Sequence, residues 1–140
     1  KQVGPNSKVP VAGDNVTIPA EWKVLLDLEN PAPIDIFIIK GTLIIPDSQS
    51  EVTIIANSMW VQGTLKAGSP AKPFVNNFNI IINGSKTSLN NIVVDSFEKG
   101  NKMIIVTGLL SLYGTAPGTT WTRLTEVLLP GADSMNVYKS

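Results

Sequence analysis

The chain has 140 residues, of which 43% are hydrophobic and 16% are charged, and this composition predicts one folded domain with a core. Lys and Arg together number 11, as do Asp and Glu, so we expect no basic face and no nucleic-acid partner. Histidine and cysteine are absent, which excludes disulfides, thiol catalysis, Ser-His-Asp chemistry and the commonest metal ligands. We therefore expect no cofactor and no metal centre. No apolar run approaches the roughly 18 residues of a membrane span, so direct membrane insertion is not expected.

Short strands separated by turns are predicted along the whole chain. No window of about 11 residues keeps a helical period without an interrupting Gly or Pro, so the fold class is all-β. Strand patterns and turn residues place the predicted strands at residues 16–18, 23–28, 34–45, 52–56, 59–65, 78–82, 89–94, 102–106, 109–113, 120–124, 126–129 and 135–138.

Four apolar runs between residues 38 and 114 each lead into a glycine. These glycines are Gly41, Gly63, Gly84 and Gly108, at steps of 22, 21 and 24 residues. A recurring step of this size predicts a parallel β-helix with about 22 residues per coil and about five or six coils. The alternative, a β-sandwich, would not explain the regular step. We expect the glycines at coil corners, where a positive φ is needed.

Two further features bear on the coil. Asn57, Asn79 and Asn101 are separated by 22 and 22 residues, which predicts a loose ladder of stacked amides between successive coils. Trp60 lies inside an apolar run and is expected in the core.

The candidate ligand-binding residues lie on both sides of the glycine repeat. Asp27 ends an apolar strand and is either a groove carboxylate for a sugar or calcium, or a residue that caps a turn. Trp22, beside charged neighbours, is the tryptophan expected to be exposed for sugar stacking. Arg123 is the only arginine and could grip a sugar carboxylate or stack on Trp121.

Modification and catalysis leave weaker marks. Asn15-Val16-Thr17 and Asn83-Gly84-Ser85 are sequons, so Asn15 and Asn83 are candidate glycosylation sites. A glycosidase needs two facing carboxylates, and no motif of the chain holds such a pair. We assign no catalytic residue.

The ordered fragments of residues 8–125 resemble the G8 domain, a family named for eight glycines. The resemblance is carried by the segments Gly13-Asp14-Asn15-Val16-Thr17-Ile18, Gly63-Thr64-Leu65-Lys66-Ala67-Gly68, Gly108-Leu109-Leu110-Ser111-Leu112-Tyr113-Gly114 and Thr120-Trp121-Thr122-Arg123-Leu124. The family occurs in large extracellular and ciliary surface proteins, including fibrocystin-like proteins and cell-migration-inducing hyaluronidases. The resemblance implies a right-handed single-stranded β-helix in an extracellular or cell-surface setting.

These observations favour a single β-helix domain over residues 1–140, excised from a larger protein. Its expected role is a non-catalytic extracellular module that gives rigid structure and a surface for a glycan or protein ligand. Its expected partners include the adjoining domains of the parent protein. The alternative is a fragment of a polysaccharide-degrading enzyme like the hyaluronidase relatives.

Overall fold

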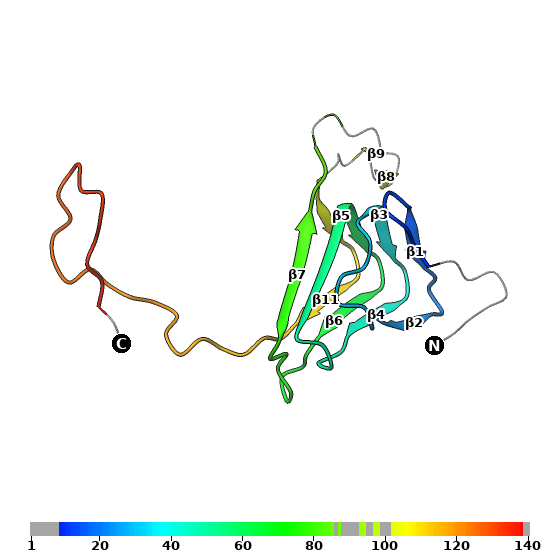
Figure 1. Cartoon of the computed structure of the whole chain (residues 1–140), viewed down its shortest axis with the longest axis horizontal. Coiled ribbons are helices and arrows are strands. Elements are labelled where there is room, and N and C mark those ends of the chain that lie inside the picture. The colour runs from blue at the N-terminus through cyan, green and yellow to red at the C-terminus, as the bar shows by residue number, and fades with distance from the viewer. Residues whose placement is uncertain (1–8, 86, 88–92, 95–96, 99–101, 139–140) are drawn as a thin grey trace.

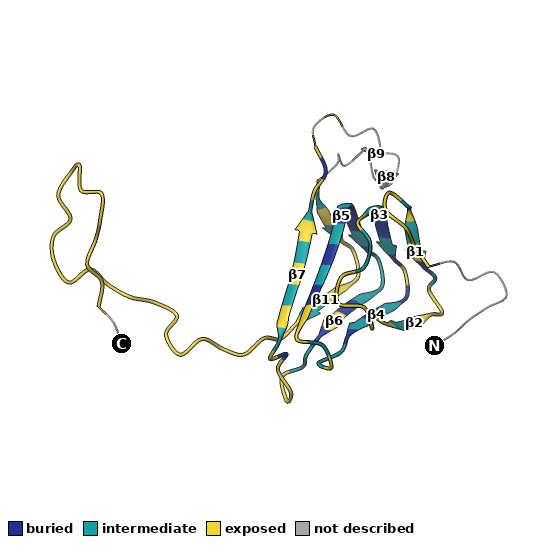
Figure 2. Cartoon of the chain, viewed as in Figure 1, coloured by how far each residue is buried: buried dark blue, intermediate teal, exposed yellow. Residues whose placement is uncertain are grey.

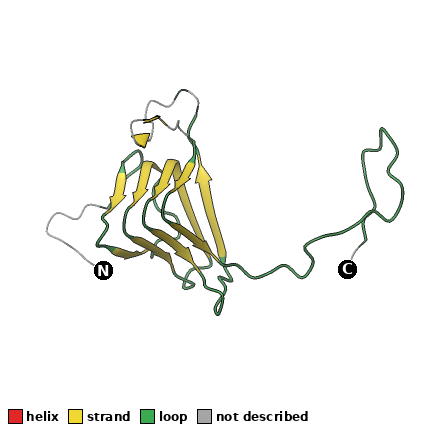
Figure 3. Ribbon diagram, turned by 180° about the vertical axis from the view of Figure 1, so that it is seen from behind, coloured by secondary structure: helices red, strands yellow, loops and turns green. Residues whose placement is uncertain are grey.

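The computed structural model describes residues 9–85, 87, 93–94, 97–98 and 102–138, and this part of the chain contains strands and no helix (Figures 1 and 3). The strands are β1 (Val16–Ile18), β2 (Lys23–Leu25), β3 (Ile34–Ile39), β4 (Thr42–Ile45), β5 (Glu51–Val61), β6 (Thr64–Ala67), β7 (Asn77–Ile82), β8 (Val93–Val94), β9 (Phe97–Glu98), β10 (Ile104–Val106) and β11 (Leu109–Leu112).

The strands form a parallel β-solenoid, which confirms the predicted fold class. One sheet has the order β1-β3-β5-β10, with β7 also paired to β5, and a second sheet has the order β11-β6-β4-β2. Every pair in these two sheets is parallel, and only the short pair β8-β9 is antiparallel. Val16 lies beside Phe37 and Phe37 beside Met59, so successive coils are 21 and 22 residues apart.

The last coil departs from this step. Met59 pairs with Ile104, 45 residues further along the chain. Strand β7 covers the first half of β5 and β10 covers the second half, and the chain makes an excursion over residues 83–103 between them. A Cβ added to Gly84 would lie 2.8 Å from the backbone nitrogen of Lys102, so the two ends of the excursion lie side by side. The prediction of five or six coils is therefore wrong, since about three turns connect four stacked layers.

The core fills the tube, because alternate residues of each strand point inward. In β5 the buried side chains are Val52, Ile54 and Ala56, and then the phase changes so that Met59 and Val61 are buried (Figure 2). This change of phase marks a corner of the coil. The full buried cluster consists of Ile18, Phe37, Ile39, Leu43, Ile45, Val52, Ile54, Ala56, Met59, Val61, Leu65, Ala67 and Phe74.

One corner is a column of glycines, as the repeat predicts, with a different membership and a different cause. A Cβ added to Gly41 would lie 2.2 Å from the carbonyl oxygen of Pro19, and one added to Gly63 would lie 2.1 Å from that of Gly41. At Gly108 the distance to the carbonyl oxygen of Gln62 would be 2.2 Å. Close stacking of backbones, rather than positive φ, requires these three glycines. Gly84 is not in the column.

A second corner is a polar column. Asn57 Nδ2 donates to Asp35 Oδ1 at 2.6 Å, and the N–H of Ile36, in the same coil as Asp35, donates to Asn15 Oδ1 at 3.2 Å. The predicted asparagine ladder is wrong, because Asn79 lies beside Thr53 in the register rather than above Asn57. The prediction for Asn101 lies outside the described residues.

The chain leaves the solenoid after β11. Every described residue from Leu112 to Tyr138 is exposed, and the segment extends away from the coils (Figures 1 and 2). An antiparallel bridge joins Leu124 to Val137, but the strands predicted over 120–124, 126–129 and 135–138 are not regular strands. Of the strand predicted over 89–94, only its end, β8, lies in the described part.

Candidate functional site

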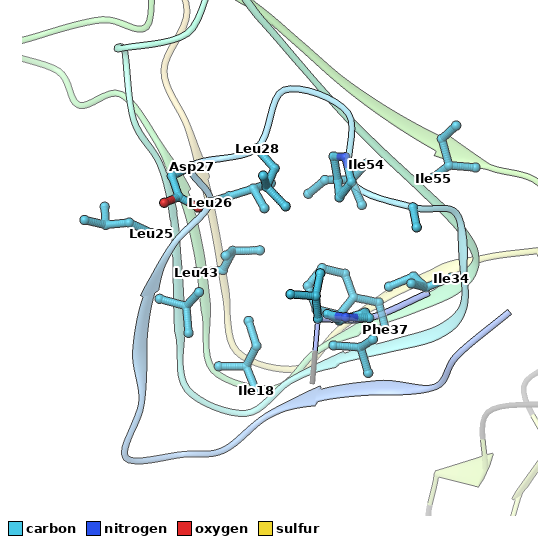
Figure 4. Close-up of a pocket in the computed structure, with 16 residues that line it drawn as sticks. Ile18, Leu25, Leu26, Asp27, Leu28, Ile34, Phe37, Leu43, Ile54 and Ile55 are labelled. Atoms are coloured by element: carbon cyan, nitrogen blue, oxygen red, sulfur yellow. The ribbon is translucent and has the colours of Figure 1, made fainter. Parts of the chain in front are cut away.

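The first coil has no coil beneath it, so its inward side chains line an open mouth. Val16, Ile18, Val24 and Leu26 belong to this coil and pack against the core of the tube. The mouth is a cavity of about 250 Å³, and Figure 4 shows the side chains around it. Its lining is formed by Val9, Pro10, Val16, Ile18, Val24, Leu25, Leu26, Asp27, Leu28, Pro31, Ala32, Ile34, Phe37, Leu43, Ile54 and Ile55.

Asp27 is the single charged residue in this lining. It follows β2, where the coil turns toward its third side, and it is exposed. One carboxylate beside an apolar cavity can accept a hydrogen bond or pair with a cation, while the cavity takes an apolar group. It does not supply the facing carboxylate pair that glycoside hydrolysis needs.

Trp22 lies at the glycine corner and does not line the cavity. Its carbonyl oxygen accepts a hydrogen bond from the N–H of Thr42 at 2.8 Å, which joins the first two coils. Its side chain is 45% exposed. Backbone contacts therefore fix the position of Trp22, and its indole stays available to solvent.

Trp121 and Arg123 lie together in the C-terminal segment. The guanidinium carbon of Arg123 is 5.9 Å from the centroid of the Trp121 ring, and Trp121 is 70% exposed. This is the geometry of a cation–π contact. The structure places this pair after the last coil and Asp27 in the first coil, so it does not bring the four predicted ligand residues into one site.

Trp60 was expected in the core, and this expectation is wrong. Its neighbours Met59 and Val61 are fully buried, so Trp60 points to the outer face of the sheet, where it is half-buried. Its Nε1 donates to Thr107 Oγ1 at 3.0 Å across the β5–β10 pair. The alternation of strand residues is the signal that could have identified this outward tryptophan.

The two sequon asparagines are both exposed. Asn15 Oδ1 accepts the Ile36 N–H, which orients the amide at the polar corner. Asn83 follows β7, and its backbone N–H donates to the carbonyl oxygen of Ala56 at 2.8 Å. Each side chain is thus held by a coil at a solvent-facing position.

Metal-binding geometry is not found among the residues that the structure describes, where no three His, Cys, Asp or Glu side chains gather. The third side of the coil has one ion pair, Lys72 Nζ to Asp47 Oδ2 at 3.1 Å. Asp47 Oδ1 and Gln49 Oε1 are buried there without a hydrogen-bond partner in the protein. In the same described part, no helix is long and apolar enough to cross a membrane.

A repeated parallel coil with a glycine corner defines a small β-solenoid module, and comparison with known proteins gives its family. The model of the G8 domain matches residues 3–125, so the chain belongs to the G8 domain family. It is 30% identical over 132 residues to protein rliB of Dictyostelium discoideum, covering 90% of this chain and 12% of that protein.

Two further relatives are much longer. The chain is 28% identical to human fibrocystin-L, covering 94% of this chain and 3% of the relative, and 28% identical to mouse fibrocystin, covering 98% and 3%. The chain thus spans between 3% and 12% of the length of these relatives, in which the matching region is one part of a much larger protein. No solved structure is significantly similar to the chain.

Proposed function

We propose that the chain is a non-catalytic, rigid module of a larger extracellular or cell-surface protein and that the ends of its solenoid join it to adjoining parts of that protein. The exposed last coil carries this proposal. Its inward residues Ile104, Val106, Leu110 and Leu112 are 37–46% exposed, while the residues beneath them in the register are at most 3% exposed. Apolar ends of this kind are what a solenoid must cover.

A matched pair of variants tests the proposed joint. Leu112 points into the last coil, and Ser111 of the same strand points to the outer face. We expect the wild-type chain to self-associate weakly at high concentration through its apolar end. Leu112→Lys should reduce that association, measured by sedimentation, and Ser111→Lys should not. Equal association of all three proteins would remove the end face as a joint.

A glycan is the ligand that we propose for the module, with Trp22, Asp27, Trp121 and Arg123 as its contacts. The exposed Trp121 ring with Arg123 beside it supports this proposal most directly, because an aromatic face can stack on a sugar while a guanidinium binds its carboxylate. We expect acidic glycans to be retained on an array by the wild type and lost in Arg123→Gln. Failure of every glycan to bind would leave a structural module alone.

The polysaccharide-degrading alternative has a direct test. Incubation with hyaluronan or pectin should leave the chain length of the polysaccharide unchanged on a gel. Shortening that disappears in Asp27→Asn or Arg123→Ala would replace the module with an enzyme.

A further inference from the structure

Strand β7 has one free edge. Its paired edge faces β5, where the N–H groups of Asn77 and Asn83 donate to Ser50 and Ala56. Because N–H groups alternate along a strand, those of Phe78, Ile80 and Ile82 face the other edge. Within the described ranges no strand pairs with that edge. An unpaired edge of this length is a template for another strand.

The chain itself returns to this edge after the last coil. Gly114 forms an isolated parallel bridge with Phe74, and the N–H of Phe74 donates to the carbonyl oxygen of Tyr113 at 2.7 Å. Continuing that register places residues 117–122 beside residues 77–82, which are β7. The same hydrogen-bond pattern then directs the N–H groups of Phe78, Ile80 and Ile82 toward the carbonyl oxygens of residues 117, 119 and 121.

The corner that this path requires already exists in an earlier coil. In the second coil the chain goes from the end of β4 at Ile45 to the start of β5 at Glu51 in six residues. From the end of β11 at Leu112 to residue 117 it has five. The chain is therefore long enough to make the turn without distortion.

The residues of the segment suit a terminal strand. Pro117 would be the first residue, where proline is tolerated, at the loss of one hydrogen bond. Thr120 and Thr122 would occupy the inner positions, and a threonine that no further coil covers still meets water with its hydroxyl group. Trp121 would lie over Ile81, whose side chain is 46% exposed on the outer face.

We propose that residues 117–122 dock as a parallel strand on the free edge of β7 and close the fourth turn of the solenoid. The segment extends away from the coils in Figure 1, so docking is a movement about residues 114–116. This inference is independent of the proposed ligand and of the proposed joint at β10 and β11.

Engineered disulfides test the register, because the chain contains no cysteine of its own. Docking puts Asn79 and Thr119 on adjacent strands, about 4.8 Å apart and within the range that a disulfide spans. Thr53 lies one strand further, at about 9.6 Å, which is too far. We expect Asn79→Cys/Thr119→Cys to form a disulfide within one chain and Thr53→Cys/Thr119→Cys to form none. Equal behaviour of the two pairs would overturn the proposal, and a disulfide-linked dimer would assign the edge to a second copy.

Hydrogen exchange gives a second readout that needs no cysteine. Docking should slow exchange at Phe78, Ile80 and Ile82. Thr119→Pro removes an N–H that faces β7 and should abolish this protection, whereas Thr120→Pro removes one that faces solvent and should keep it. Fast exchange at the three β7 amides in the wild type would contradict docking.

Discussion

The glycines of the stacked corner set how closely the coils approach. At Gly41, Gly63 and Gly108 the space of a Cβ is occupied by a backbone carbonyl oxygen of the neighbouring coil. A backbone atom within a paired sheet cannot move aside as a flexible side chain can. The requirement is therefore steric, and it applies to every residue larger than glycine.

The substitution Gly63→Ala tests this requirement. Its Cβ would lie 2.1 Å from the oxygen of Gly41 and 2.2 Å from that of Lys40, so we expect a loss of about 3 kcal/mol in the free energy of unfolding, at the upper end of overpacking costs. Gly118→Ala is the control, because a Cβ there meets nothing within 4 Å. Urea unfolding of both variants gives the comparison, and equal stabilities would show that the coils can separate at this corner.

The polar corner offers a second residue-scale test. The Asn57–Asp35 hydrogen bond is partly buried and joins two coils through an acidic side chain. Asn57→Ala should cost about 1.5–3 kcal/mol, as for other hydrogen bonds to charged groups. Asn79→Ala removes exposed bonds to Glu51 and Thr53 and should cost less. A larger loss in the Asn79 variant would contradict the assignment of the inter-coil contact to Asn57.

Sequence reasoning located part of this detail. Gly41, Gly63 and Gly108 were found because one coil corner recurs at nearly constant spacing. Gly84 fitted the same spacing by coincidence, since β7 and β10 both pair with β5 and the excursion between them leaves no periodic mark. The apolar mouth beside Asp27 was not predicted, because the end of a tube arises from the absence of a neighbouring coil and not from a local pattern.

At the scale of elements, β5 is the strand on which the first sheet is assembled. It has β3 on one edge and both β7 and β10 on the other. The second sheet has a simpler gradient, in which β6 is covered on both edges and β11 on one. Position in the stack, more than residue type, therefore sets how much apolar surface a side chain loses on folding.

Leu65 and Leu110 measure that gradient with identical chemistry. They are neighbours in the register of β6 and β11, yet Leu65 is fully buried and Leu110 is 37% exposed. We expect Leu65→Ala to cost about 2–5 kcal/mol, the range for a buried leucine, and Leu110→Ala to cost clearly less. Denaturant unfolding checks the order, and equal losses would mean that the last coil is covered in solution.

At the scale of the molecule, two surface asparagines bear on where the protein is made. Produced through a secretory pathway, the chain should carry glycans on Asn15 and Asn83, because both side chains are exposed on held corners of the coil. Mass spectrometry before and after enzymatic deglycosylation measures occupancy. Thr17→Val and Ser85→Ala should each remove one glycan. A secreted product without glycans on either asparagine would remove this support for the extracellular proposal.

The order of the coils also determines how the module would respond to tension. The chain runs into the first coil and out of the last, so force applied through neighbouring domains acts on the end strands first. Hydrogen bonds between coils would then break one layer at a time, as in peeling. Each released coil of 22 residues would lengthen the chain by about 70 Å. The module is thus expected to yield in discrete, small-force steps, behaving as an extensible spacer within its parent protein.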